Sequence, residues 1–251
     1  MKTIKTILAA AVLSTGALAS GAAGAAEFYG LNSGWLSVSS QAGFNSVGVR
    51  GAGMDYQGTG GQFEGYFAPS AAAVSNRIDE NFLRFFCIEI GEPANVLEPV
   101  KYTRSNYGND PLRKLYDVAY TNRTAGDFYN GARTPLGVFA NAADATAFQL
   151  AVWELSFDTD HNLAQGAANS FYSTNLTSAA IRTKAQGWLD AVNHYSGTGY
   201  QSWQLSRFVN NGAQDYVAGF YVEPHNNVPE PGSLALLGLA LVGLAGLKRR
   251  R

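Results

Sequence analysis

Two polar side chains that lie in apolar segments could do chemistry together. Cys87 is the single cysteine of the chain and lies in residues 85–90, where closely spaced apolar residues predict a strand. Gln149 lies in residues 147–154, where apolar residues recur at helical spacing. Attack of the Cys87 sulfur on the side-chain carbonyl of Gln149 would release ammonia and leave an internal thioester. Because a thioester is an activated acyl group, an amine or hydroxyl of a partner could then become joined to Gln149.

The elements that must position this pair are a strand and a helix. Strand alternation places Cys87 and Glu89 on one face, where Glu89 could assist proton transfer. Helical spacing places Gln149 at the margin of an apolar face, with Trp153 on the same flank as a further supporting residue. Burial of a carboxamide without hydrogen-bond partners destabilises a fold by about 1–3 kcal/mol. Condensation with the sulfur would remove this cost, because the amide donors are lost. The alternative is a buried strand thiol beside a glutamine that hydrogen-bonds to a loop.

The residues around the pair form a pattern. Phe86 precedes Cys87, and residues 148–153 read Phe-Gln-Leu-Ala-Val-Trp. This resembles the thioester domains of bacterial surface adhesins, in which an aromatic residue or leucine precedes the cysteine. The pattern continues later with an apolar residue and then the glutamine. After the glutamine come two positions of any type and two apolar residues. The resemblance spans about residues 45–222 and implies a β-sandwich-like body with a helical subdomain. It also implies that Cys87 is the thioester sulfur and Gln149 the acyl donor.

The first 26 residues are typical of a secretory signal peptide. Lys2 and Lys5 supply the positive start, residues 7–19 supply an apolar run, and residues 23–26 supply a small-residue cleavage site. The apolar run is too short and too rich in glycine for a membrane-spanning helix. We therefore expect residues 1–26 to be removed on export.

The C-terminal residues 228–251 contain three parts in a fixed order. The first is a box made of Pro229, Glu230 and Pro231. The second, residues 232–247, carries no charge and suits a short transmembrane helix, and the third, residues 248–251, is entirely basic. The order and spacing closely resemble the PEP-CTERM sorting signal. That resemblance implies a Gram-negative bacterium, recognition by an exosortase, cleavage near the box, and a link to exopolysaccharide or biofilm. The alternative is an uncleaved single-pass anchor.

Composition and charge exclude several classes of protein. The chain has 251 residues, of which 46% are hydrophobic and 15% are charged. A chain of this length and hydrophobic content can bury a core. A single cysteine excludes a disulfide framework and a multi-cysteine metal cluster. Between residues 27 and 230 there are 12 Lys and Arg against 19 Asp and Glu, a net charge of −7. Neither nucleic acid nor an anionic membrane surface is therefore an expected partner.

Residues 27–227 are expected to form one α+β domain, an antiparallel β-sandwich or barrel-like body with an inserted helical subdomain. Strand alternation comes first, helical periodicity follows, and strands return at the end. Residues 58–61 are rich in glycine and predict a turn. Capping residues predict helices that begin at Asp110 and Asp144, and an apolar stripe predicts a third helix that begins at about Ser178. The predicted strands cover residues 34–40, 46–50, 62–67, 82–90, 100–103, 203–209 and 216–222.

Other polar motifs give weaker signals. Asp158, Asp160 and Asn162 place oxygen ligands at alternate positions, like the start of a calcium loop. Leu163 stands where such a loop has glycine, and Asn169 stands where it has glutamate, so a polar turn is the favoured interpretation. The three histidines of the chain form neither a zinc-helix motif nor a hydrolase triad.

These signals favour an exported cell-surface or extracellular-matrix protein that is not an enzyme. Its thioester would act once per molecule in covalent adhesion or crosslinking, without cofactor or metal. The expected partners are an exosortase and an exopolysaccharide or a surface amine or hydroxyl nucleophile, with a transient anchor in the inner membrane. The alternative is a non-catalytic structural protein of the biofilm matrix that associates with polysaccharide and has no thioester. A secreted hydrolase is disfavoured, because no acid–base pair or nucleophile–base set is recognisable.

Overall fold

The computed structural model describes residues 31–221 apart from residues 52, 77–81, 93, 121–138, 140 and 167–169. The predicted signal peptide and the C-terminal sorting signal lie outside the described residues. The elements in chain order are β1 (Ser33–Gly51), β2 (Met54–Ala68), α2 (Ala71–Ser75), β3 (Phe82–Cys87), β4 (Val100–Asn106), α3 (Asp110–Ala119), α5 (Ala142–Phe157), β5 (Tyr172–Ser173), α6 (Ala179–Asn193), the 3-10 helix η2 (Gly199–Ser202), β6 (Trp203–Val209) and β7 (Tyr216–Tyr221).

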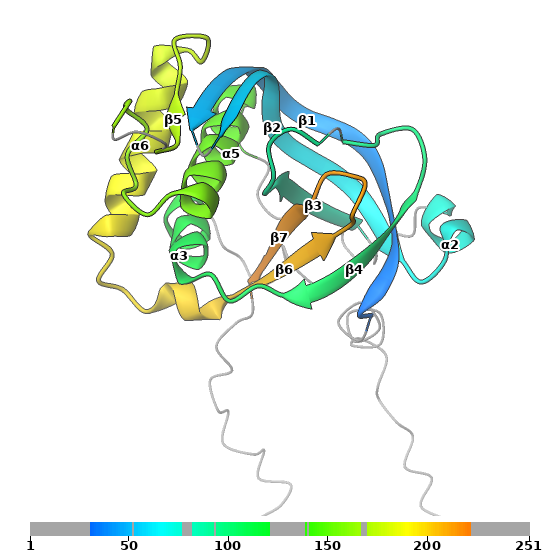
Figure 1. Ribbon diagram of the computed structural model, residues 1–251. Helices are drawn as coiled ribbons and strands as arrows, with labels where there is room; N and C mark the ends of the chain where they lie inside the picture. The colour runs from blue at the N-terminus through cyan, green and yellow to red at the C-terminus, as the bar shows by residue number, and fades with distance from the viewer. Residues whose placement is uncertain are drawn as a thin grey trace, which may run out of the picture.

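A closed antiparallel sheet forms the body of the described part of the chain (Figure 1). The strand order is β2-β3-β7-β6-β4-β1, and β1 also pairs with β2, which closes a barrel of six strands among the described residues. The short strand β5 pairs with the far end of β1. The fold is mostly β. The sequence predicts a sandwich or a barrel, and the structure shows a barrel.

Strands β1 and β2 form one long hairpin. The sequence predicts two strands at residues 34–40 and 46–50, whereas β1 is continuous over Ser33–Gly51. Register shifts at residues 38–40 and 42–44 bend the strand without ending it. One strand can therefore pair with β4 near its start and with β5 near its end.

The glycine-rich residues 58–61 lie inside β2, so the turn predicted there is wrong. A Cβ atom at Gly61 would lie 2.1 Å from the carbonyl oxygen of Gly43 on β1. A Cβ atom at Gly60 would lie 3.4 Å from Cγ of Gln149 on α5. Glycine at these two positions therefore leaves room for β1 and α5 to pack closely against β2. Close packing of this kind, and not only a turn, is a common reason for glycine within a strand.

Helix α5 is the central helix of the fold (Figure 1). It contacts β1, β2 and β3 of the barrel as well as the helices α3 and α6. Its residues 145–155 are all buried, so Gln149 is enclosed and does not lie at the margin of an apolar face. The helices and the barrel share one hydrophobic core, and a separate helical subdomain is not confirmed.

The helix starts differ slightly from those predicted. Helix α3 begins at Asp110, but its N-cap is Asn109. Helix α5 is capped by Asn141 and not by Asp144, because the Asn141 side chain accepts the hydrogen bond of the Asp144 amide at 2.9 Å. Helix α6 is capped by Ser178, close to the predicted start.

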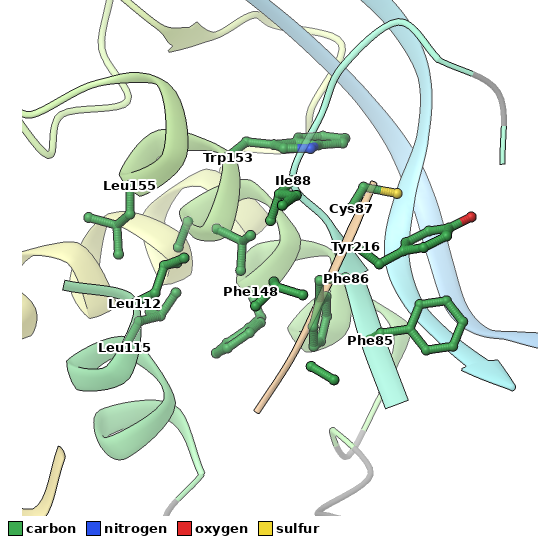
Figure 2. Packing of buried hydrophobic residues seen from close by; sticks show 14 of the residues in the cluster. Phe85, Phe86, Cys87, Ile88, Leu112, Leu115, Phe148, Trp153, Leu155 and Tyr216 are labelled. Carbon is green, nitrogen blue, oxygen red and sulfur yellow. The ribbon is translucent and has the colours of Figure 1, made fainter. Parts of the chain in front are cut away.

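Strand β3 presents one face to the barrel interior and the other to α5 (Figure 2). The ring of Phe85 lies 4.7 Å from the ring of Tyr216 on β7 inside the barrel. The ring of Phe86 lies 4.6 Å from the ring of Phe148 on α5. Alternation places Cys87 on the same face as Phe85. The strand ends at Cys87, three residues earlier than predicted.

Candidate functional site

The side chain of Gln149 is hydrogen-bonded to the main chain of Cys87. The Cys87 amide donates to Oε1 of Gln149 at 2.9 Å, and Nε2 of Gln149 donates to the Cys87 carbonyl at 2.8 Å. Cys87 is 7% exposed and Gln149 is 0% exposed. The structure thus brings together the two residues singled out in the sequence, and both ends of the buried carboxamide have a partner.

The Gln149 carboxamide takes the place of a neighbouring strand. The pairing of β2 with β3 stops at Phe63 and Phe85, so no β2 residue pairs with Cys87. On its other side, Cys87 pairs with Tyr216 of β7. A carboxamide carries one carbonyl and one N–H group in the same relation as a peptide group, so it can satisfy the open edge of β3.

The sulfur of Cys87 lies on the barrel side of β3. Figure 2 shows the Cys87 side chain directed away from Phe148 and α5, on the side of the Tyr216 ring. The hydrogen bonds of Gln149 within the described residues join main-chain atoms of Cys87 and not its sulfur.

The thiol of Cys87 is difficult to ionise. Burial raises its pKa far above the ordinary value, and the charge of Glu89 raises it further. The thiol is therefore protonated at neutral pH, and a reaction requires a base to take its proton. Burial, followed by the charges of Asp215 and Glu92, raises the pKa of Glu89. The role of Glu89 in proton transfer stays a prediction.

Trp153 covers the main chain that follows Cys87. Its indole Nε1 donates to the carbonyl of Glu89 at 3.2 Å, and Nε2 of Gln214 donates to the same carbonyl at 3.0 Å. The Trp153 ring packs edge-on against Tyr56, with 5.8 Å between the ring centroids. The buried indole thus fixes the segment after β3 and helps to separate Cys87 from solvent.

Thr146 also positions Gln149, although no pattern in the sequence indicates this role. Its Oγ1 donates to the Gly60 carbonyl at 2.7 Å and accepts from the Asn45 amide at 3.1 Å. These bonds hold α5 against both strands of the long hairpin, one turn before Gln149. A threonine inside a helix carries no local sign of such a contact, because the partners lie about a hundred positions away in the chain.

Other predicted positions do not join this site. Residues 158–162 form the expected polar turn after α5, in which side-chain oxygens of Asp158 and Asp160 accept backbone N–H groups. His161 and His194 interact with Asn193 and with the end of α6 respectively. Residues 229–231 lie outside the described residues.

Comparisons with known proteins inform the C-terminal end of the chain. Residues 227–251 match the family described as the PEP-CTERM protein-sorting motif. No curated protein and no solved structure matches the chain. No helix in the described residues has the length and apolar character needed to cross a membrane. The sorting motif implies an exported protein that an exosortase sorts to the surface of a Gram-negative bacterium.

Proposed function

We propose that this exported protein forms an internal thioester between Cys87 and Gln149, which it uses once for covalent adhesion or crosslinking. The observation that carries the proposal is the pair of hydrogen bonds that holds the buried carboxamide on the residue whose sulfur would attack it. Export and sorting to the cell surface would place the reactive bond where a surface amine or hydroxyl is available.

The hydrogen bond from the Cys87 amide favours the chemistry. When the sulfur adds to the carboxamide carbon, negative charge develops on Oε1 of Gln149. The Cys87 N–H donates to this oxygen at 2.9 Å, so it would stabilise the charge as an oxyanion-hole donor does. Serine proteases use the backbone N–H of the nucleophilic residue in the same role.

The reaction balances with the groups of the two side chains. The S–H bond of Cys87 breaks, the sulfur bonds to the carboxamide carbon, and the thiol proton leaves with the Gln149 amino group as ammonia. A later amine attacks the same carbon, and the proton that it loses restores the thiol. The apolar surroundings of Cys87 and Gln149 would protect the bond from water between these steps.

Amine labelling tests this function. The folded chain is incubated with a fluorescent primary amine, and peptide mapping locates the label. The proposal predicts one label at Gln149, release of the Cys87 thiol, and no label in Cys87→Ala. Absence of a label in the folded wild-type chain, or equal labelling of Cys87→Ala, would contradict it.

The second candidate is a structural protein of the matrix that has the same fold and no thioester. One observation favours it: the carboxamide has two good hydrogen bonds to main-chain atoms while the sulfur points away from α5 (Figure 2). In that case Gln149 serves only to complete the edge of β3. A Cys87 thiol that titrates fully in the freshly unfolded chain, with no prior amine treatment, would support this candidate.

A further inference from the structure

Three carboxylates gather at the C-terminal end of α5, away from the hydrogen bonds of Cys87. One oxygen each from Glu154, Asp158 and Asp160 lies within 4.8 Å of the others. Glu154 is on the helix, Asp158 is its C-cap, and Asp160 lies in the following turn. Like charges at this spacing repel each other unless a proton or a cation lies between them.

Glu154 is the unusual member of this cluster. It is 0% exposed, and its Oε1 accepts a hydrogen bond from the Asn162 amide at 2.9 Å. Its Oε2 is buried and has no hydrogen-bond partner within the described residues. Buried carboxylate oxygens normally have a donor, a proton or a metal ion beside them, so either a proton shared with Asp160 or a cation accounts for this oxygen.

The two aspartates are held in place by the backbone. Asp158 accepts from the amides of Thr159 and Asp160 through Oδ1, and from the Phe171 amide at 2.8 Å through Oδ2. Asp160 accepts from the Asn162 amide at 2.9 Å. These bonds fix the orientation of both carboxylates and leave a lone pair on Oδ2 of Asp158 and on the carboxylate of Asp160 for a cation.

The surroundings do not supply a compensating positive charge. The last turn of α5 contains no basic residue, and the C-terminal end of a helix carries the negative end of its dipole. None of the ion pairs in the described ranges involves Glu154, Asp158 or Asp160.

We propose that Glu154, Asp158 and Asp160 bind a calcium ion. Calcium takes oxygen ligands at about 2.3–2.6 Å, so two oxygens on one ion lie at most about 5 Å apart, as these three do. The exposed position of Asp160 gives the ion a path from solvent and leaves room for water ligands. Three protein ligands predict a weak site, in the range of about 10⁻⁴–10⁻³ M found in extracellular modules.

The site differs from the calcium loop considered in the sequence. That loop takes its glutamate from the twelfth position, whereas here the buried carboxylate comes from Glu154, four residues before Asp158. The ion would tie the end of α5 to the turn at residues 158–162 and to Phe171, since Asp158 already accepts from the Phe171 amide. The calcium site is independent of the thioester, and either can exist without the other.

A calcium titration tests the site. The purified full-length chain in detergent is treated with EDTA, and its Tm is measured from 0 to about 10 mM CaCl₂ at constant ionic strength. The proposal predicts a saturable rise of several degrees with a midpoint in the range given above. Asp160→Asn should shift that midpoint by at least about tenfold, and because Asp160 is exposed this variant should fold. Glu98→Gln, which removes an exposed carboxylate elsewhere, should respond as the wild type does.

Three results would overturn the proposal. The first is an unchanged Tm in a chain that melts cooperatively. The second is an equal calcium response in Asp160→Asn and the wild type. The third is an equal response to MgCl₂ at the same concentration, because a site that selects calcium should distinguish the smaller ion.

Discussion

The contact between Gln149 and Cys87 makes a quantitative prediction about stability. In the chain without a thioester, Gln149→Ala removes both hydrogen bonds and leaves the amide and the carbonyl of Cys87 buried without partners. Each unsatisfied group costs about 1–3 kcal/mol, so the free energy of unfolding should fall by about 2–6 kcal/mol. A matched control is Gln62→Ala, since Gln62 is also buried but donates to Tyr120 away from Cys87.

Cys87→Ala separates a thioester from a simple hydrogen-bonded contact. The variant keeps both main-chain hydrogen bonds with Gln149, so without a thioester it loses only the packing of the sulfur, about 1 kcal/mol. A thioester would crosslink residues 62 positions apart, and closing a loop of that length stabilises a fold by about 4 kcal/mol. With a thioester in the wild type, Cys87→Ala should therefore lose about 5 kcal/mol.

Urea unfolding of the three variants and the wild type supplies the measurement. Large losses for both Gln149→Ala and Cys87→Ala are expected. A loss of only about 1 kcal/mol or less for Cys87→Ala would refute the crosslink, and a similarly small loss for Gln149→Ala would refute the role of the carboxamide at the edge of β3.

Three further predictions concern the neighbours of the site and the carboxylate cluster. Burial, a hydrogen bond with the Asp160 side chain, and the charges of Asp160 and Asp158 raise the pKa of Glu154 from 4.5 to about 8. Between pH 4.5 and 8 the folded state then binds more protons than the unfolded state, so the free energy of unfolding in EDTA should fall as the pH rises. In thermal melts the Tm of Glu154→Gln should fall less steeply with pH than the Tm of the wild type. Trp153→Phe loses the bond to the Glu89 carbonyl, and amine labelling of Gln149 should become faster; an unchanged rate would exclude a shielding role. Gly60→Val should crowd Cγ of Gln149 and reduce the labelled fraction, whereas Gly187→Val, in open space, should not.

Apolar alternation before Cys87 and helical spacing around Gln149 predicted a strand and a helix at these positions, because both patterns are local. Periodicity does not say that the two residues meet. That prediction came from the chemistry open to a thiol and a carboxamide and from the resemblance to thioester domains, and the hydrogen bonds between Gln149 and the main chain of Cys87 agree with it. The helix starts were nearly right, since capping side chains act within a few residues. The sorting motif was recognised for the same reason, because its information is entirely local.

Features that depend on long-range pairing were not predictable. Gly60 and Gly61 read as a turn, because nothing local shows that α5 and β1 approach them closely. The continuity of β1 and the closure of the barrel depend on its partners β2 and β4. The carboxylate cluster around Glu154 was not predictable either. The helical pattern indicates that Glu154 is buried, but it does not show that the following turn brings two more carboxylates next to it.

The most direct test of the thioester is the intact mass of the folded chain, with its two ends defined by peptide mapping. Condensation of Cys87 with Gln149 releases one ammonia, so the wild-type chain should be about 17 Da lighter than its sequence. Treatment with methylamine should raise the mass to about 14 Da above the sequence value, and Cys87→Ala should show neither change. A wild-type chain that has the full sequence mass, and keeps it in methylamine, would contradict the account.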